Sequence, residues 1–477
     1  MHARWRRRAE FTLGRWRATR SVVTADAWPA NLRESASKST RIEKQTYEKP
    51  SANLRDIDYA RAMSALLTRH LLPFARETIG VFPAVVIQGA RRVGKSTFAG
   101  MLTEGLAAEH FTFDDAATRD AVRADPDAFV AQFPGKALVL DEVQRVPEIV
   151  LPIKAAIDRD RRPGRFILTG STDLLKVPGT ADSLAGRAAT IHVHGLSQGE
   201  MVGRSDDFVT RILDDGTPAA FRTTWRRQDY VEMLARGAYP EVQGLEGRMR
   251  TVWLDGYLAR IIERDAASVY RQVQPARLRA VLRLLAANQS GELVKGRLAE
   301  QSGIPATSIS TYLDVAAAIF LVSALPPWTP NLTRREIGRH KSIVLDSAVA
   351  MRLARMSTGQ LEPLVGGDHL GPMLEGFVVS ELMKQAGWSE TSYALSHYRD
   401  RNGVEVDLVV ELDDGRVIGI KVKAASSFRG EHFSGLRSFA ERLGPRFAGG
   451  IVLGTGEAGY QHAERLWGLP ISALWEW

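Results

Sequence analysis

The chain has 477 residues, of which 44% are hydrophobic and 25% charged, as in ordinary globular proteins long enough for several domains. It contains no cysteine, which excludes disulfides, thiolate catalysis and cysteine-based zinc sites. No apolar run approaches the length of a transmembrane helix, so we expect no membrane span and a cytoplasmic protein. The formal net charge is +8, and nearly all of it comes from the first 50 residues.

Basic residues of this N-terminal stretch are interleaved with Trp5 and Trp16. One interpretation is an arm that binds nucleic acid or a membrane surface. The other is a disordered tail, or an extension upstream of a start near Met63. We favour the second and predict a basic, disordered arm over residues 1–62, followed by a helix over residues 59–76 that leads into the next domain.

Residues 89–96 match the phosphate-binding pattern G-x-x-x-x-G-K-[ST]. An apolar strand over residues 84–87 precedes the motif, and a helix is expected from Thr97 onward. Backbone amides and a helix N-terminus would then face an anion. We expect Lys95 to reach the β- and γ-phosphates and the Ser96 hydroxyl to hold Mg²⁺. The predicted nucleotide-binding residues are Gly89, Ala90, Arg91, Arg92, Val93, Gly94, Lys95, Ser96 and Thr97.

A second apolar strand over residues 137–140 ends in two acids, Asp141 and Glu142. Carboxylates in this position suit Mg²⁺ and water. We predict that Asp141 holds the metal through its water shell. Glu142 would orient and deprotonate the attacking water, which makes Glu142 and Lys95 the leading catalytic candidates.

A third strand, over residues 165–169, is followed by Ser171, a candidate for placing the water between the acids and the γ-phosphate. Residues 183–187 end in Arg187, which could stabilise transition-state charge on its own or a neighbouring subunit's nucleotide. A solvated arginine at a helix end is the alternative. The chain has no [NT]-K-x-D segment for guanine, so ATP is the expected nucleotide.

Strands and helices alternate to about residue 196, which predicts a parallel α/β sheet. Residues 201–225 are polar and predict a lid or loop, and helices are expected over 228–236 and 253–269. Residues 292–313 have the shape of a helix-turn-helix with Gly303 at the turn. The exposed face of its second helix has hydroxyl residues but no Arg or Lys, so a structural role and DNA contact both remain open. A basic cluster nearby could compensate: Arg334, Arg335, Arg339, His340 and Lys341.

The C-terminal third predicts an amphipathic helix over residues 373–385 that carries Glu375. A hairpin over 398–410 carries Asp407, and a strand over 416–423 carries Lys421. This order is typical of restriction-type nucleases, in which two acids hold Mg²⁺ and a lysine activates water.

Taken together, these motifs resemble a family of AAA-type ATPases that pair an N-terminal P-loop module with a C-terminal domain of unknown function. The resemblance covers residues from about 63 to the C-terminus, including residues 237–241, Arg264, Asp265 and residues 341–346. It implies an AAA-like sheet, a winged-helix segment and a nuclease-like terminal domain, but no substrate. Where the family has a metal-binding Glu, this chain has Lys421, whose charge would repel Mg²⁺.

We therefore expect an α/β protein with five parts: the arm over residues 1–62, a P-loop ATPase domain over 63–200, a lid or helical linker over 201–255, a winged-helix-like domain over 256–355, and a nuclease-like, inactive α/β domain over 356–477. The predicted function is an ATP-binding, Mg²⁺-dependent ATPase that couples nucleotide state to movement of the C-terminal half. Residues 290–345 would contact a DNA or protein client, and the chain could assemble as a homo-oligomer. The alternatives are a nucleotide-gated DNA-binding regulator with little turnover, or a metal-dependent nuclease.

Overall fold

A computed structural model of the protein describes residues 67–173, 184–214, 216, 220–362 and 369–477. All of them belong to one unit of the chain, Leu54–Trp477. The arm predicted over residues 1–62 and Ser183 of the predicted arginine segment lie outside the described residues. None of the helices in this described part is both long and apolar enough to cross a bilayer.

A parallel sheet is formed by β1 (Ala84–Gln88), β2 (Ala108–Thr112), β3 (Ala137–Asp141), β4 (Phe166–Gly170) and β5 (Ala188–His192). Their order is β2-β3-β4-β1-β5, which confirms the parallel α/β sheet predicted from the alternation of strands and helices. β1 and β4 are buried along their whole length. Strands covered on both faces need continuous apolar sequence, and this is what both strands have.

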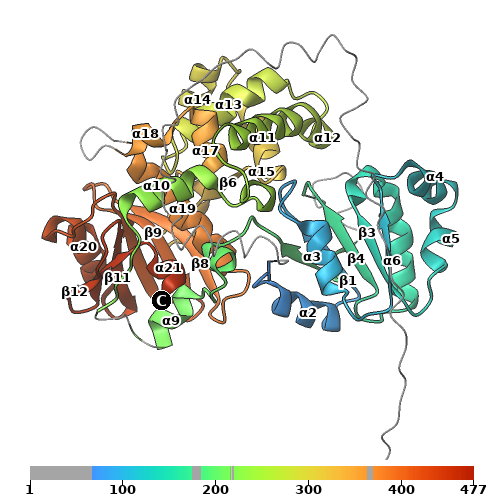
Figure 1. Ribbon diagram of the computed structural model, residues 1–477, viewed down its shortest axis with the longest axis horizontal. Helices are drawn as coiled ribbons and strands as arrows, with labels where there is room; N and C mark the ends of the chain where they lie inside the picture. The colour runs from blue at the N-terminus through green and yellow to red at the C-terminus, as the bar shows by residue number, and fades with distance from the viewer. Residues whose placement is uncertain (1–66, 174–183, 215, 217–219, 363–368) are drawn as a thin grey trace, which may run out of the picture. The chain divides into compact units, whose positions relative to one another are not determined.

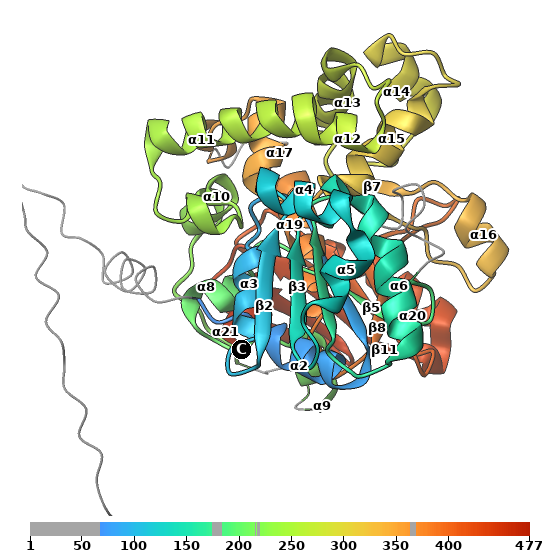
Figure 2. The ribbon, with the colours of Figure 1, turned by 90° about the vertical axis from the view of Figure 1, so that its right-hand side faces the viewer.

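Helices cover both faces of this sheet. α2 (Leu72–Val81) and α3 (Lys95–Leu102) pack on the face that carries Val85 and Ile87. The opposite face carries Val86 and Leu140, and it is covered by α4 (Ala116–Ala124), α5 (Pro126–Ala131) and α6 (Val150–Arg159). Figure 1 shows α3 and α6 on the two sides of β1 and β4, and Figure 2 shows α5 and α6 beside the strands.

The sheet register aligns the carboxyl ends of three strands. Gln88 at the end of β1 pairs with Gly170 at the end of β4, and Leu140 of β3 pairs with Leu168 of β4. The loops that follow β1, β3 and β4 therefore begin at one edge of the sheet. Ligands of open parallel sheets bind at this edge.

The segment after β5 differs from its prediction. Residues 201–225 were expected to form a polar lid or loop, but α8 (Gln198–Val202) ends inside the segment and α9 (Phe208–Asp214) forms a helix within it. Asp206 and Phe208 are each only 1% exposed. The backbone N–H of Phe208 donates to Gln385 Oε1 at 3.0 Å. The segment is polar because its charged residues find partners inside the protein, and composition alone cannot reveal this.

The middle of the chain is helical, as predicted. α10 (Arg227–Arg236) ends at Gly237, which has a φ of 72°. α11 (Gly247–Arg260) continues through a π-helical turn, η7 (Ile261–Asp265), into α12 (Ala266–Val269). Figure 2 shows α11 and α12 along one helix. The helix predicted over residues 253–269 is confirmed, and the structure adds the π turn.

Three helices and a pair of strands follow: α13 (Pro275–Ala287), α14 (Lys295–Ser302), α15 (Ile309–Ala318) and the antiparallel β6 (Val322–Leu325) and β7 (Lys341–Val344), with α16 (Leu332–Ile337) between the strands. Gly303 makes the turn between α14 and α15 with a φ of 65°, which favours glycine. The predicted helix-turn-helix is confirmed, while its identity as a winged helix stays a prediction.

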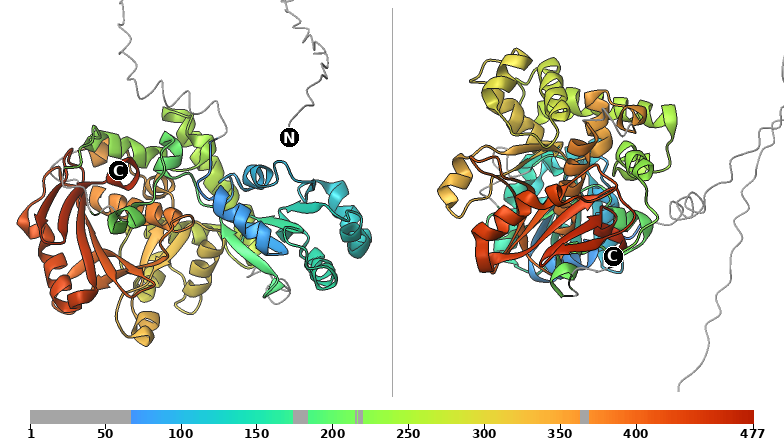
Figure 3. Two further views of the ribbon diagram at one scale, coloured as in Figure 1. Left: turned by 90° about the horizontal axis from the view of Figure 1, so that it is seen from below. Right: turned by 90° about the vertical axis from the view of Figure 1, so that its left-hand side faces the viewer.

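A mixed sheet makes up the C-terminal part. After α17 (Ser347–Ala354), α18 (Thr358–Leu361) and α19 (Leu370–Gln385), its strands are β8 (Tyr393–Arg399), β9 (Glu405–Leu412), β10 (Val417–Val422), β11 (Phe447–Gly454), β12 (Tyr460–Ala463) and β13 (Leu466–Pro470), with α20 (Ser434–Leu443) before β11 and α21 (Ala473–Glu476) at the end. Their order is β12-β13-β11-β10-β9-β8, and Figure 3 shows the sheet in orange to red. The predicted hairpin is confirmed as β8 and β9.

The helix predicted over residues 373–385 is present as α19, but it is not amphipathic. Most of its residues are buried on all sides, including the polar Glu381, Lys384 and Gln385. α19 and α20 pack on opposite faces of the C-terminal sheet, α19 against Leu408 and Ile420. A helix buried all round is a core helix.

Candidate nucleotide-binding site

Residues 89–96 connect β1 to α3 and form a tightly curled loop. Gly94 has φ 92° and ψ 28°, a left-handed conformation that glycine adopts without strain, and it caps α3. A side chain at Gly89 would lie 2.0 Å from the Val193 carbonyl oxygen, so only glycine fits there. α3 begins at Lys95, two residues earlier than the predicted start, and this brings Lys95 and Ser96 into its first turn. The loop therefore has the form that a phosphate-binding loop needs.

Lys95 lies inside this loop with only 5% of its surface exposed. Its Nζ donates to the carbonyl oxygens of Gly89 and Ala90 at 3.1 and 2.9 Å. Burial lowers the pKa of Lys95 to about 8, although Glu142 and Asp141 partly oppose this shift. The lysine is thus held where a triphosphate would restore its full charge.

The Asp141 carboxylate, at the carboxyl end of β3, accepts hydrogen bonds from three hydroxyl groups. Its Oδ1 accepts from Ser96 Oγ at 2.9 Å and from Thr169 Oγ1 at 2.5 Å, and its Oδ2 accepts from Thr112 Oγ1 at 3.4 Å. A carboxylate beside a hydroxyl is a hard oxygen donor set, which suits Mg²⁺ completed by phosphate oxygens and water. The described residues include no cluster of three or more His, Asp or Glu that would hold a metal unaided. Ser96 and Asp141 together offer one hydroxyl and one carboxylate oxygen to a metal.

Glu142 follows immediately in a left-handed conformation, with φ 60° and ψ 46°. Such a conformation costs a non-glycine residue roughly 1–3 kcal/mol and is found preferentially at functional sites. Glu142 Oε2 accepts from Ser171 Oγ at 2.9 Å and also from Gln144 Nε2, which in turn donates to Ser171 Oγ at 2.9 Å. Its backbone N–H donates to Thr169 Oγ1 at 3.2 Å. The structure thus brings the predicted Glu142 and Ser171 together and adds Gln144.

The remaining residues of the loop differ in burial and in their partners. Ala90 and Val93 are buried, and Thr97 is exposed. Arg92 forms an ion pair with Glu241 at 2.8 Å, and Arg91 lies 3.5 Å from Asp265 of η7. Both loop arginines therefore face acids of the helical region.

Arg187 lies at the end of β1 that is opposite to the phosphate loop. Its carbonyl oxygen accepts from Ala84 N at the start of β1, whereas the phosphate loop follows the other end of that strand. A five-residue strand puts these ends about 15 Å apart. Its guanidinium forms a bidentate pair with Asp158, at 2.7 and 3.0 Å. Arg187 does not reach the phosphate loop of its own chain. A role on a neighbouring subunit's nucleotide and the alternative of a solvated arginine both stay predictions.

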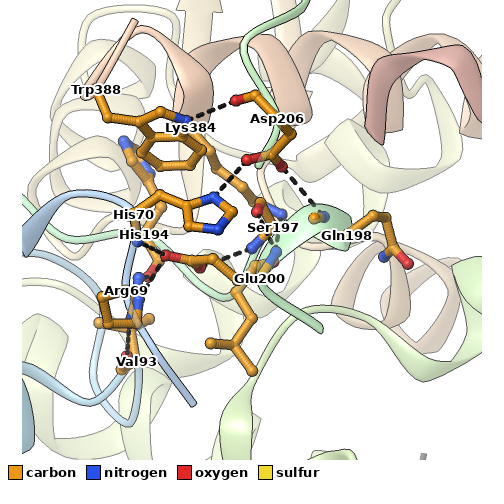
Figure 4. A network of polar contacts seen from close by, with 12 residues as sticks. Arg69, His70, Val93, His194, Ser197, Gln198, Glu200, Asp206, Lys384 and Trp388 are labelled. Atoms are coloured by element: carbon orange, nitrogen blue, oxygen red, sulfur yellow. Dashed lines mark hydrogen bonds and ion pairs between the residues drawn. The ribbon is translucent and has the colours of Figure 1, made fainter. Parts of the chain in front are cut away.

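Arg69 braces the phosphate loop, and sequence reasoning did not identify it. Figure 4 shows its guanidinium between three groups. It donates to the Val93 carbonyl at 3.1 Å, to the His194 carbonyl at 2.8 Å, and to Glu200 Oε1 at 3.0 Å. Glu200 belongs to a capping box with Ser197 at the start of α8. The spacing S-x-x-E at residues 197–200 is the sequence signal that could have marked this acid.

The network continues from α8 to α19. His70 Nδ1 lies 2.5 Å from Asp206 Oδ1, and Trp388 Nε1 donates to the Asp206 carbonyl at 2.7 Å (Figure 4). Gln198 N donates to Glu381 Oε2 at 2.9 Å. Lys384 Nζ donates to the Leu196 carbonyl at 2.9 Å and to Glu381 Oε1 at 2.5 Å. A continuous polar path therefore joins the phosphate loop to the central helix of the C-terminal part.

The acids of the predicted nuclease-like site are neutralised by lysines. Lys341 Nζ lies 2.8 Å from Glu375 Oε1 and 3.0 Å from Glu405 Oε1. Lys421 Nζ lies 3.4 Å from Asp407 Oδ1, and Val422 N donates to Asp407 Oδ2 at 2.8 Å. Burial, and next the charge of Asp407, raise the pKa of Glu375 to about 8 despite Lys341. Two lysines thus stand where a metal would need free carboxylates.

The predicted basic cluster is also paired with acids. Arg335 forms a bidentate pair with Glu411 at 2.5 and 3.0 Å, and Arg339 lies 3.5 Å from Glu292. Lys341 is only 3% exposed. On the helix-turn-helix, Lys295 Nζ donates to Ser310 Oγ at 3.1 Å. Arg335 and Lys341 are thus engaged with acids within the chain, whereas Arg339 and Lys295 stay exposed to solvent.

Comparison with known proteins agrees with this geometry. Residues 81–202 match a family model described as an AAA domain, residues 370–474 match a domain of unknown function (DUF4143), and residues 227–360 match another domain of unknown function (DUF8612). Two proteins, described as uncharacterised, from Mycobacterium tuberculosis and Mycobacterium bovis are each 29% identical over 347 residues, which is 72% of this chain and 71% of theirs. A solved Walker-type ATPase of Pyrococcus abyssi is 14% identical and covers 64% of this chain and 98% of its own, with a TM-score of 0.40. By the two family matches, the chain carries an AAA-type, P-loop ATPase-like domain followed by a DUF4143-type domain.

Proposed function

We propose that the protein is a Mg²⁺-dependent ATP hydrolase whose nucleotide state is coupled to its C-terminal region. One observation carries the proposal. Around the buried Lys95, the Asp141 carboxylate is bonded to Ser96 while the neighbouring Glu142 carboxylate is held apart from it by Ser171 and Gln144. Two adjacent acids thus have different partners, as a metal ligand and a general base require.

The residues divide the reaction as follows. The loop amides and Lys95 hold the β- and γ-phosphates. Mg²⁺, when held by Ser96 and Asp141, would neutralise charge on the phosphate oxygens. Glu142 orients a water and accepts its proton as the water oxygen bonds to the γ-phosphorus. The bond between the γ-phosphorus and the bridging oxygen breaks, its electron pair leaves with ADP, and Glu142 then returns the proton to solvent.

The path through Arg69 supports the coupling. Arg69 holds the Val93 carbonyl of the phosphate loop and the Glu200 carboxylate of α8. α8 is held in turn by Glu381 of α19. Closure of the loop on ATP would shift Arg69 and transmit that shift to α19, because buried ion pairs tolerate little misalignment.

The alternative functions have less support. A nucleotide-gated DNA-binding regulator acting through residues 290–345 would need free cations, and Arg335 and Lys341 are paired with acids. A protein client would not need them. A metal-dependent nuclease would need carboxylates free of Lys341 and Lys421.

Steady-state release of phosphate from Mg-ATP tests the proposal. Wild-type turnover should be lost in Glu142→Gln, which removes the base and keeps the shape, while calorimetry should still detect Mg-ATP binding by that variant. Lys95→Ala should lose both binding and turnover. Binding by the wild type without turnover would favour the regulator. DNA cleavage that Asp407→Ala abolishes would favour the nuclease.

A further inference from the structure

We propose that Arg91 is the cation that stabilises the transferred phosphoryl group in this chain, and that Asp265 is the positioning residue that holds it ready. The inference rests on the proposed ATP hydrolysis and deepens it. It assigns within one chain the charge that phosphoryl transfer needs beyond Lys95 and Mg²⁺. Arg187 cannot supply that charge to its own nucleotide, because it lies at the opposite end of β1.

The Arg91–Asp265 pair has longer and fewer contacts than the two bidentate pairs Arg187–Asp158 and Arg352–Asp255. Arg187 and Arg352 each form two bonds with their aspartates, at 2.7 and 3.0 Å and at 2.6 and 2.6 Å. Arg91 approaches Asp265 only to 3.5 Å, with side chains just 13% and 14% exposed. Among the described residues, Arg91 Nε and Asp265 Oδ2 are buried and have no hydrogen-bond partner.

This mismatch is costly for a purely structural pair. A buried donor or acceptor without a partner destabilises the fold, and more so when it is charged. Of Arg91, Arg187 and Arg352, Arg91 is the most buried and has the fewest hydrogen bonds to its aspartate. Selection for stability alone would give the most buried arginine the best hydrogen bonds. A guanidinium with unmet donors inside a phosphate loop is suited to an anion that enters that loop.

The backbone brings Asp265 to this place by an unusual device. Asp265 is the last residue of η7, a π-helical turn within the long helix formed by α11 and α12. π turns are rare in proteins and occur frequently at functional sites. The turn changes the direction in which later side chains point, and here it carries a carboxylate from the helical region to the phosphate loop.

The Arg91–Asp265 pair interacts electrostatically with Lys95 and Glu142, the residues proposed to act on the nucleotide. Arg91 and Asp265 both act on the pKa of Lys95, which Arg91 lowers and Asp265 raises. Burial raises the pKa of Asp265, Arg91 lowers it, and Glu142 raises it further. Arg91 belongs to the phosphate loop, four residues before Lys95, and its guanidinium lies 3.5 Å from Asp265. On binding, Arg91 would exchange its weak contact with Asp265 for the γ-phosphate oxygens.

The test compares Arg91→Gln, which removes the charge but keeps a polar side chain, and Asp265→Asn, which keeps the side-chain size. The matched control pair from the helical region is Arg352→Gln and Asp255→Asn. Three quantities are measured: kcat for Mg-ATP, the dissociation constant for Mg-ADP, and trapping of ADP with aluminium fluoride, which mimics the transferring phosphoryl group. Arg91→Gln should lower kcat on the order of 10³-fold and abolish trapping, with Mg-ADP affinity close to wild type. Asp265→Asn should lower kcat about 10²-fold, because it misplaces Arg91. The control variants should behave as wild type.

The double variant distinguishes positioning from a structural role. If Asp265 acts through Arg91, Arg91→Gln/Asp265→Asn should be no slower than Arg91→Gln alone, whereas independent effects would multiply. Wild-type kcat in Arg91→Gln, or a raised KM with unchanged kcat, would overturn the inference and leave ATP hydrolysis intact. Should Arg91→Gln fail to bind Mg-ADP, Arg91→Lys takes its place, and full kcat in that variant would equally overturn the assigned fork geometry. A wild type that neither binds nor hydrolyses Mg-ATP would overturn the proposed function and this inference with it.

Discussion

Binding of Mg-ATP should draw a proton onto the protein near pH 8. Burial lowers the pKa of Lys95 from 10.5 to about 8, so at pH 8 about half of the free protein carries a neutral amine. The triphosphate would place negative charge beside Nζ and return the pKa toward its ordinary value. Uptake should therefore be about half a proton per site at pH 8 and about a tenth at pH 7.

Calorimetry in two buffers measures this uptake. The observed binding enthalpy is compared in buffers with small and large ionisation enthalpies, and the difference gives the number of protons. The phosphates themselves contribute little, since their second pKa lies near 6. Lys95→Arg is the control, because its guanidinium stays charged and should show no uptake. Clear binding by the wild type with no proton uptake at pH 8 would refute the reasoning, as would equal uptake by Lys95→Arg.

The same shift sets a pH dependence for the stability of the nucleotide-free protein. The folded-state pKa of Lys95 lies below its unfolded value, so the unfolded chain binds more protons between these two values. Stability should therefore rise with pH from about 8 to 10.5, by about 3 kcal/mol at about 1.4 kcal/mol per pKa unit. Urea unfolding of wild type and Lys95→Met across this range measures the difference, and a wild-type contribution that falls with rising pH would contradict the sign.

Three further predictions concern the surroundings of the loop. Arg69→Ala leaves the buried Glu200 carboxylate without its cation. The free energy of unfolding, measured by urea titration, should fall by about 3–5 kcal/mol. A loss of about 0–1 kcal/mol, as for a surface ion pair, would contradict the role of Arg69. Burial alone would lower the pKa of His70, but its bond to Asp206 raises the pKa overall. The stabilisation lost in His70→Gln should therefore be largest below pH 6.5 and shrink as the pH rises through the folded-state pKa. Urea titrations at pH 5.5 and 8 check this, and a larger loss at pH 8 would contradict it. Ser171→Ala removes a hydrogen bond to the Glu142 carboxylate and should lower kcat about tenfold, with unchanged Mg-ATP affinity. This is a part of the roughly 10²–10⁴-fold rate enhancement that general-base catalysis contributes. Unchanged kcat in the phosphate-release assay would remove Ser171 from the site.

The parallel sheet and its phosphate loop were predictable because their signals are local. Residues 89–96 form one contiguous motif, and Asp141 and Glu142 directly follow a short apolar strand. Parallel strands bring such loops to one edge of a sheet, so their meeting follows from fold class alone. The bonds of Asp141 with Ser96 and of Glu142 with Ser171 agree with that expectation.

What the sequence did not reveal depends on contacts between distant residues. Arg69 and Glu200 are 131 residues apart, and each is an ordinary charged residue until the fold brings them together. Asp265 gains its position from a π turn, for which no sequence rule is available. The burial of α19 was missed because Glu381 and Lys384 look like surface residues, yet they neutralise each other in the core. The position of Arg187 required the register of β5 against β1.

Hydrolysis in ¹⁸O-labelled water tests the central claim most directly. If Glu142 directs water at the γ-phosphorus, the purified chain with Mg-ATP should release phosphate that carries one solvent-derived ¹⁸O, while the ADP remains unlabelled and Glu142→Gln releases almost none. Label in the β-phosphate of ADP, or no release of phosphate by a chain that binds Mg-ATP, would contradict this account.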